Sequence, residues 1–240
     1  MGSSFEASNY DDSVNLGSRR YMAKVKDVSP KGFDPKSVKK VALGVSLGSQ
    51  NSELARLDGL IQCIASEFDE CTICVGDYVY RLTLQLRQPD LTPDEATEMA
   101  IEADHEYRAM CSAITSQYNE FCNFKWRSMT DIVEEYPDEF SAYYEQMKTL
   151  YETDKSFRAS VREFSQASVE RIADEAVEGD DLTGAPVTTL KYLLEECAIF
   201  SCLCAEEPLT LVYAGSIKSI EDLCESKFEA MPEVMKNSRL

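Results

Sequence analysis

The sequence predicts a single α/β domain built on a parallel β-sheet. Two short apolar runs rich in β-branched residues, at 41–45 and 71–75, have the composition of buried strands, and an amphipathic stretch with helical spacing joins them at 52–68. A strand, a helix and a strand in such close succession form a right-handed parallel unit. No internal repeat or linker divides the rest of the 240 residues, which favours one domain over two.

The remaining elements follow from local patterns. Residues 1–38 are polar, have no sustained apolar period and are predicted to be a disordered leader before a domain at 39–240. Thr92 followed by Pro93 and two acids is a helix start, and the helix should run to about residue 121. The later elements are expected to be a strand at 123–129, a helical turn at 131–135, one or two helices within 138–176, a surface loop at 178–184, a largely buried helix from Pro186, a strand at 209–213 and a weakly helical tail.

Charge and cysteine content narrow the class of protein. A net charge of −19 disfavours binding to nucleic acid or anionic membranes unless a local basic patch opposes it. The nine cysteines are an odd number and several lie in apolar runs, which favours reduced thiols in a cytoplasmic protein. Cys71 and Cys74 have metal-site spacing, but they lie in a predicted strand without a second ligand pair, so we expect no metal. No apolar run is long enough to span a bilayer.

A serine stands at the end of the first predicted strand. Residues 44–48 read Gly-Val-Ser-Leu-Gly and match the G-x-S-x-G nucleophile elbow, which would expose Ser46. The alternative is that Ser49 or Ser52 caps the following helix and Ser46 has no role. A serine hydrolase also needs a histidine, and the sole histidine, His105, lies among acids in a predicted helix where it should face solvent.

Other groups could move a proton for Ser46. Tyr192 and Glu196 lie at i and i+4 of one helix, and Tyr213 ends a predicted strand. The alternative for the tyrosines is core packing with one polar edge, and for Glu196 a place on the helix surface.

Taken together, four segments resemble the cyclodipeptide synthase family. They are GVSLGSQNS after the first strand, FKWRSMTDIVEE, LKYLLEECAIF and the later LTLVY, and their order and spacing agree over roughly residues 38–230. The resemblance implies a Rossmann-like parallel sheet flanked by helices, similar to the catalytic core of the tyrosyl- and tryptophanyl-type class I aminoacyl-tRNA synthetases. Ser49, Ala198 and Ala214 depart from the residues typical of the family, so the chain would be a divergent member.

The resemblance also implies a reaction. Ser46 would accept an aminoacyl group from one aminoacyl-tRNA in a ping-pong mechanism, a second aminoacyl-tRNA would yield a dipeptidyl-enzyme, and cyclisation would release a 2,5-diketopiperazine of secondary metabolism. Tyr192 and Glu196 would hold and deprotonate the amino group, and Tyr213 would position the intermediate. Substrate-binding positions would be Ala42, Gly44, Ser49, Cys74, Met129, Ile199 and Leu211.

The same resemblance sets expectations about partners. The enzyme would need no cofactor, metal or membrane and would be a monomer or weak dimer. The small side chains of Ala42 and Cys74 favour a roomy apolar pocket for a large aromatic amino acid. Family members carry basic residues on the helix that begins at Pro93, but here that helix is acidic. Transfer RNA would then be held by other cations, namely the leader, Arg81, Arg87, Lys125, Arg127, Arg158 and Arg162.

Two alternatives remain open at this stage. One is a serine esterase or acyltransferase that uses Ser46 through the G-x-S-x-G turn. The other is an inactive relative that binds tRNA or a protein, which the acidic helix favours.

Overall fold

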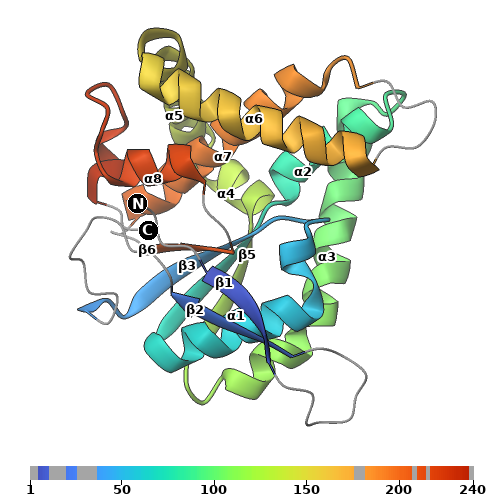
Figure 1. Ribbon diagram of the computed structural model, residues 1–240, viewed down its shortest axis with the longest axis vertical. Coiled ribbons are helices and arrows are strands. Elements are labelled where there is room, and N and C mark those ends of the chain that lie inside the picture. Colours follow the sequence, from blue (N-terminus) through green and yellow to red (C-terminus); the bar gives the residue numbers. More distant parts are fainter. Residues whose placement is uncertain are drawn as a thin grey trace.

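A parallel sheet of four strands forms the centre of the computed structural model (Figure 1). The structure describes residues 5–10, 20–25, 37–175, 182–206, 210–214 and 217–237. The strands lie in the order β5-β4-β3-β6 and neighbours pair in parallel, so their carboxyl ends meet at one edge. Their bounds are Lys40–Val45 for β3, Glu70–Val75 for β4, Asn123–Ser128 for β5 and Thr210–Tyr213 for β6.

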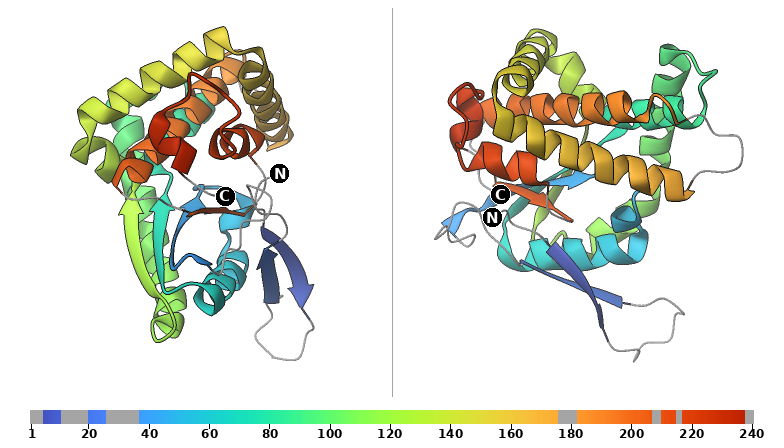
Figure 2. Two further views of the ribbon diagram at one scale, coloured as in Figure 1. Left: turned by 90° about the vertical axis from the view of Figure 1, so that its left-hand side faces the viewer. Right: turned by 45° about the horizontal axis from the view of Figure 1, so that its top comes forward.

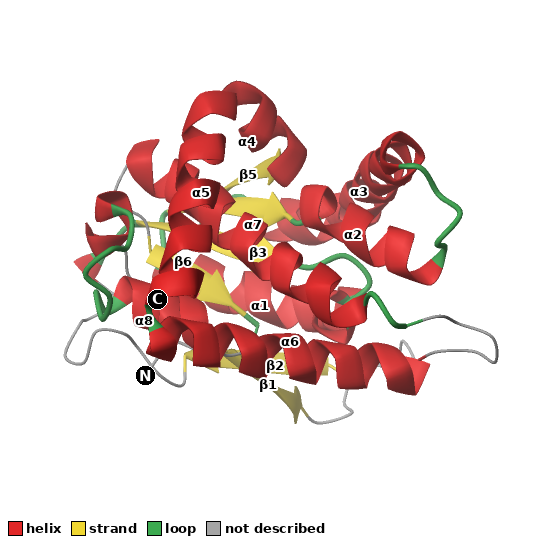
Figure 3. Cartoon of the chain, turned by 90° about the horizontal axis from the view of Figure 1, so that it is seen from above, coloured by secondary structure: helices red, strands yellow, loops and turns green. Residues whose placement is uncertain are grey.

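Helices cover both faces of this sheet, and Figure 3 shows several of them lying over the strands. The bounds are α1 Leu54–Glu67, α2 Asp77–Arg87, α3 Pro93–Tyr118, α4 Met129–Glu135, α5 Pro137–Thr153, α6 Lys155–Glu175, α7 Ala185–Glu206 and α8 Lys218–Cys224, with 3-10 turns at Gln50–Ser52 and Glu233–Asn237.

Alternation along the strands divides the core in two. In β3, Val41, Leu43 and Val45 pack with residues of α1 and α3, whereas Ala42 packs with residues of α7. Tyr213 of β6 also belongs to the α7 side. The fold therefore has three layers, with α1 and α3 on one face of the sheet and the α5–α8 assembly on the other.

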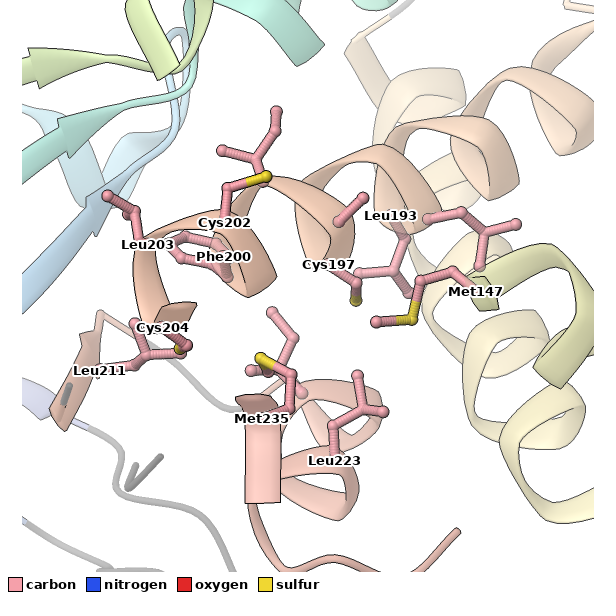
Figure 4. Packing of buried hydrophobic residues seen from close by; sticks show 14 of the residues in the cluster. Met147, Leu193, Cys197, Phe200, Cys202, Leu203, Cys204, Leu211, Leu223 and Met235 are labelled. Atoms are coloured by element: carbon pink, nitrogen blue, oxygen red, sulfur yellow. The ribbon is translucent and has the colours of Figure 1, made fainter. Parts of the chain in front are cut away.

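Helix α7 is the centre of the larger core. It is buried almost all round from Leu193 to Cys204, as its apolar sequence predicts. Figure 4 shows Cys197, Phe200 and Leu203 on this helix, with Leu223 and Met235 from the C-terminal segments packed against it. A helix so enclosed holds any polar side chain it carries rigidly in the interior.

Most of the predicted elements are present, with differences in detail. Helix α3 begins at Pro93 with a Thr92–Glu95 capping box, and the stretch 138–176 contains two helices. Helix α2 had not been assigned from the sequence. The tail, predicted to be weakly helical, forms α8 and a 3-10 turn that begins after Pro232. The loop predicted at 178–184 lies largely outside the described residues.

Two segments of the stretch predicted to be a disordered leader form strands in the structure. Residues Phe5–Tyr10 (β1) and Arg20–Val25 (β2) pair as antiparallel strands, and Figure 2 shows this ribbon beside α1. The contact is close because Gly59 of α1 has no side chain: a Cβ there would lie 2.4 Å from the Tyr21 carbonyl oxygen. The ribbon could not be recognised from the sequence, because the alternation of apolar and polar residues in such short, polar strands is weak. An isolated two-stranded ribbon is only marginally stable, and this one is stabilised by packing on α1. The rest of 1–36 lies outside the described residues.

Two expectations from composition can be compared with the fold. Cys71 and Cys74 lie on opposite faces of β4, in different core clusters, so they do not share a site. Within the described ranges, no helix is long and apolar enough to cross a membrane.

Candidate active site

A cavity of about 400 Å³ opens at the carboxyl edge of the sheet. The loop that follows β3 forms one wall, the end of β6 contributes Tyr213, and α2, α6 and α7 form the rest. This edge is where ligands of open parallel sheets bind, because the loops diverge there and leave a crevice. All four residues predicted to be catalytic, Ser46, Tyr192, Glu196 and Tyr213, line this one cavity, as do Gly44 and Ser49.

The loop that carries Ser46 is anchored from three sides. The Ser52 hydroxyl donates a hydrogen bond of 2.6 Å to the Ser46 carbonyl oxygen, and the Tyr107 hydroxyl donates one of 2.9 Å to the Ser52 carbonyl. The Asn51 amide donates to the carbonyl of Ala214, at 2.6 Å, just after β6. These bonds fix the backbone of the loop relative to α3 and the end of β6, so a partly buried Ser46 side chain is presented to the cavity in a defined place.

This loop is not a nucleophile elbow. In an elbow the helix begins directly after the serine, whereas here residues 46–53 precede α1 and include a 3-10 turn. Ser49 caps that turn by accepting a hydrogen bond from the Asn51 N–H at 3.2 Å. Helix α1 itself begins after Glu53 without a side-chain cap, so neither Ser49 nor Ser52 caps the helix as the alternative interpretation expected. Gly48 adopts φ +72°, which a side chain would disfavour.

Glu196 is a buried carboxyl group with a perturbed pKa. Its side chain is 2% exposed, and burial raises its pKa from 4.5 to about 8, although the nearby Tyr213 hydroxyl lowers it in part. Among the described residues, Glu196 Oε2 and Tyr213 Oη have no hydrogen-bond partner of good geometry, including each other. Two unpaired polar atoms in a buried position indicate a place prepared for a ligand.

Burial and the adjacent Glu196 also raise the pKa values of Tyr192 and Tyr213. A hydrogen bond with Ser46 and the charge of Arg171 act in the opposite direction on the Tyr192 pKa. Tyr192 is held in orientation by Phe164, whose ring stacks on it with centroids 6.4 Å apart. Both phenols therefore stay protonated at neutral pH and can donate hydrogen bonds.

The other predicted substrate-binding residues lie behind the cavity. They do not line it but belong to the α7-side core, each at most 1% exposed: Ala42, Cys74, Met129, Ile199 and Leu211. Burial raises the pKa of the Cys74 thiol, so this group is an inert apolar wall. The structure brings these five residues together on the α7 side of the sheet, the side that also holds Tyr213, but their side chains are buried away from the cavity.

Several cavity residues were missed by the sequence analysis. Tyr80, Thr83 and Arg87 come from α2, the helix that had not been assigned, and Ser168 and Arg171 come from α6. Their spacing within each helix places them on one side of it, which is a signal that could have been found once the helices were known.

Most of the cations predicted to hold RNA have other partners. Arg81 is 12% exposed and forms a bidentate pair with Glu195, with both N–O distances at 3.0 Å. Arg127 bridges Glu135 and Glu206, and Lys125 lies 3.6 Å from Glu70.

On α6, Arg158 donates to two backbone carbonyls, and Arg162 donates to the Tyr151 hydroxyl. Of the cations proposed from the sequence, Arg87 alone lines the cavity. The leader's basic residues mostly lie outside the described ranges. His105 is exposed, as predicted.

The described side chains include no group of three or more histidine, cysteine or acidic residues arranged to hold a metal ion. The cavity's polar side chains are hydroxyls, the carboxamides of Gln50 and Asn51, one carboxyl and two guanidinium groups, a set suited to proton transfer and anion binding.

No family model and no curated protein matches this sequence. Solved structures do match. A cyclodipeptide synthase from Fluoribacter dumoffii aligns with a TM-score of 0.70 at 21% identity, covering 80% of this chain and 84% of that one. One from Candidatus Glomeribacter gigasporarum, solved bound to Phe-tRNAPhe, aligns with a TM-score of 0.64 at 18% identity over 80% and 85%.

A Mycobacterium tuberculosis protein, described as showing that cyclodipeptide synthetases are related to type I tRNA synthetases, aligns with a TM-score of 0.59 at 15% identity, with 83% of each chain covered. At such identities the likeness concerns the fold. The Rossmann-like class predicted from the sequence is therefore confirmed: this chain has the fold of the cyclodipeptide synthases.

Proposed function

We propose that this protein is a tRNA-dependent cyclodipeptide synthase and a divergent member of that family. The observation that carries the proposal is the meeting of Ser46, Tyr192, Glu196 and Tyr213 in one cavity, on the fold of these enzymes. Their residue types supply one nucleophile, one titratable carboxyl and two phenols, which is the set needed for successive acyl transfers without a metal or cofactor.

In the first step the Ser46 hydroxyl oxygen attacks the ester carbonyl of an aminoacyl-tRNA. The bond from that carbonyl to the terminal ribose oxygen breaks, the ribose takes up the serine proton, and an aminoacyl-serine remains. One ester replaces another, so the step is close to isoenergetic and needs no ATP. The hydrogen bond between Ser46 and Tyr192 supports a role for the phenol in orienting the hydroxyl.

In the second step the amino group of the aminoacyl-serine attacks a second aminoacyl-tRNA. It must lose a proton to do so, and an α-amino group has a pKa of about 7.7–8.0. Glu196, with its pKa near 8, is matched to accept that proton, because a base is most effective when the two pKa values are close. Peptide-bond formation releases the second tRNA and leaves a dipeptidyl-serine.

In the third step the free amino group of the dipeptide attacks the serine ester. The ring closes, the Ser46 oxygen leaves as the hydroxyl, and the 2,5-diketopiperazine is released. Tyr213 is 5% exposed and its hydroxyl is unpaired in the described structure, so it can donate a hydrogen bond to an intermediate without breaking one. We assign it the positioning of the dipeptidyl group.

The substrate pocket remains a proposal as well. The small side chains of Ala42 and Cys74 favour a large aromatic first amino acid, although both are fully buried in this structure. The proposed partners are two aminoacyl-tRNAs, the proposed location is the cytoplasm, and the proposed assembly is a monomer or weak dimer.

The test is mass spectrometry of medium from bacteria that express the chain, beside Ser46→Ala and a control, Ser66→Ala. Ser66 is exposed on α1 and bonds to the Cys63 carbonyl, so its loss should leave the cavity intact. We expect new cyclic dipeptides from the wild type and from Ser66→Ala only.

Product from Ser46→Ala would contradict the assigned nucleophile. Absence of product from every culture would favour the inactive binding protein. Hydrolysis of p-nitrophenyl esters that depends on Ser46, without cyclic dipeptides, would favour the esterase, although the loop after β3 lacks the elbow geometry of such enzymes.

A further inference from the structure

Two arginines lie at the cavity in a protein whose net charge is −19. Arg87 is the last residue of α2 and Arg171 lies on α6, and both side chains are exposed. The residues beside them, Leu86 and Ile172, pack together in a small buried cluster with Ala185. This contact fixes the ends of the two helices against each other, so the two guanidinium groups share one part of the cavity wall.

Arg171 has no carboxylate partner among the described side chains, whereas Arg81, Arg127 and Lys125 each have one. Its positive charge acts on the candidate active site, because it lowers the pKa of Tyr192 whereas burial raises that pKa. A guanidinium that is exposed, close to the nucleophile and not neutralised by a carboxylate is suited to bind an anion from solution.

The substrate of the proposed function is aminoacyl-tRNA, a polyanion. Its aminoacylated 3′ end must reach Ser46. The acidic helix α3 repels it, and Arg81, Arg127 and Lys125 already face carboxylates. An aminoacyl ester is carried on the terminal ribose, so the phosphates of the last nucleotides must pass the cavity mouth whenever the ester reaches Ser46.

We propose that Arg87 and Arg171 bind the phosphates of the 3′-terminal nucleotides of the aminoacyl-tRNA and so position the ester at Ser46. This inference rests on the proposed function and adds to it the residues that replace a basic α3. Because the terminal nucleotides are common to all tRNAs, the two arginines act on both substrates and are indifferent to the amino acid attached.

The test is steady-state kinetics of the purified full chain with two aminoacyl-tRNAs at several salt concentrations. The variants are Arg171→Ala, Arg87→Ala and the double variant, with Arg171→Lys to keep the charge. Lys155→Ala is the control, because Lys155 is an exposed cation at the start of the same helix and does not line the cavity.

We expect KM to rise about tenfold or more in the double variant near physiological salt, with kcat changed less than about twofold. The slope of log KM against log salt should fall by about one for each arginine removed. Arg171→Lys should retain the wild-type slope, and Lys155→Ala should match the wild type throughout.

Three results would overturn the proposal. An unchanged KM and slope in the double variant would exclude phosphate contact. A KM effect confined to one acidic aminoacyl group would show that the arginines bind a side-chain carboxylate instead. A loss of kcat alone would assign them to the chemical steps.

Binding of uncharged tRNA to the same variants separates this inference from the proposed function. If the wild type makes no product, the proposed function fails, and the inference is then decided by affinity alone. Binding that weakens in the double variant but not in Lys155→Ala supports the two arginines, and equal binding by all variants refutes them.

Discussion

Tyr213 lies directly against the backbone of Gly44. A Cβ atom at position 44 would come 2.7 Å from Tyr213 Cζ and 3.0 Å from its hydroxyl oxygen. The glycine that opens the G-x-S-x-G sequence therefore makes room for a phenol from the neighbouring strand. Its role is in the packing of two parallel strands, β3 and β6.

Gly44→Ala should displace the Tyr213 ring and lower product formation by at least about tenfold, since the ring cannot keep its place beside a methyl group. The measurement is the rate of cyclic dipeptide formation by the purified variant. Gly184→Ala is the control, because a Cβ there would meet nothing within 4 Å. Equal activity of both variants would contradict the close packing of Tyr213 on β3.

Glu196 predicts a dependence of activity on pH. Its pKa is raised to about 8 by burial, so the carboxylate form, which we propose accepts the amine proton, is scarce at pH 6 and abundant at pH 9. The rate at saturating substrate should rise about tenfold per pH unit below pH 8 and level off above it, and Glu196→Gln should be nearly inactive across the range. A wild-type rate that is flat from pH 6 to 9 would argue against Glu196 as the base.

The same pKa shift has a consequence for stability. The folded state holds the proton more tightly than the unfolded state, whose value is near 4.5, so the stabilisation is complete below about pH 4.5 and is lost as pH rises through 8. Glu196→Gln should therefore be more stable than the wild type at pH 9 by a few kcal/mol, with a smaller difference at pH 5. Urea unfolding at the two pH values measures this, and a difference independent of pH would refute it.

The sequence predicted the parts of the site whose pattern is local. Ser46, Tyr192, Glu196 and Tyr213 stand in recognisable segments, and strands such as β3 have an unambiguous apolar run. Helix α2 could not be found in this way, because Leu82, Leu84 and Leu86 alternate like a strand.

The structure shows why that alternation is compatible with a helix. α2 packs on several neighbours, and its buried residues belong to different clusters: Val79 to the α7-side core, Leu84 to a cluster with α3, and Leu86 to one with α6. Burial on more than one side removes the single apolar stripe from which a helix is recognised. Arg87, and with it part of the cavity wall, was out of reach for the same reason.

Arg81 and Glu195 join α2 to α7 in a buried ion pair. Arg81 also lies over the Tyr78 ring, 3.8 Å from its centroid, and Glu195 is 3% exposed. Arg81→Ala should destabilise the fold by about 3 kcal/mol, because it removes the bidentate partner of a buried carboxylate and leaves it only the more distant Lys191, at 3.7 Å. Lys39→Ala, which removes a pair with both side chains more than half exposed, should cost less than about 1 kcal/mol. If thermal unfolding shows that Arg81→Ala and Lys39→Ala cost similar amounts of stability, the ion pair of Arg81 and Glu195 is hydrated rather than buried.

The contact between the β1–β2 ribbon and α1 can be tested by a substitution that stabilises the protein without the contact and destabilises it with the contact. In an isolated helix Gly59→Ala would stabilise by about 1 kcal/mol, since alanine has the higher helix propensity. With β2 in place, the new methyl group would meet the Tyr21 carbonyl oxygen at 2.4 Å, and backbone cannot move aside without separating the ribbon from the helix. We therefore expect destabilisation in the full chain, and stabilisation in a chain that begins at residue 37. If Gly59→Ala stabilises both chains in urea unfolding, the ribbon does not pack on α1 in solution.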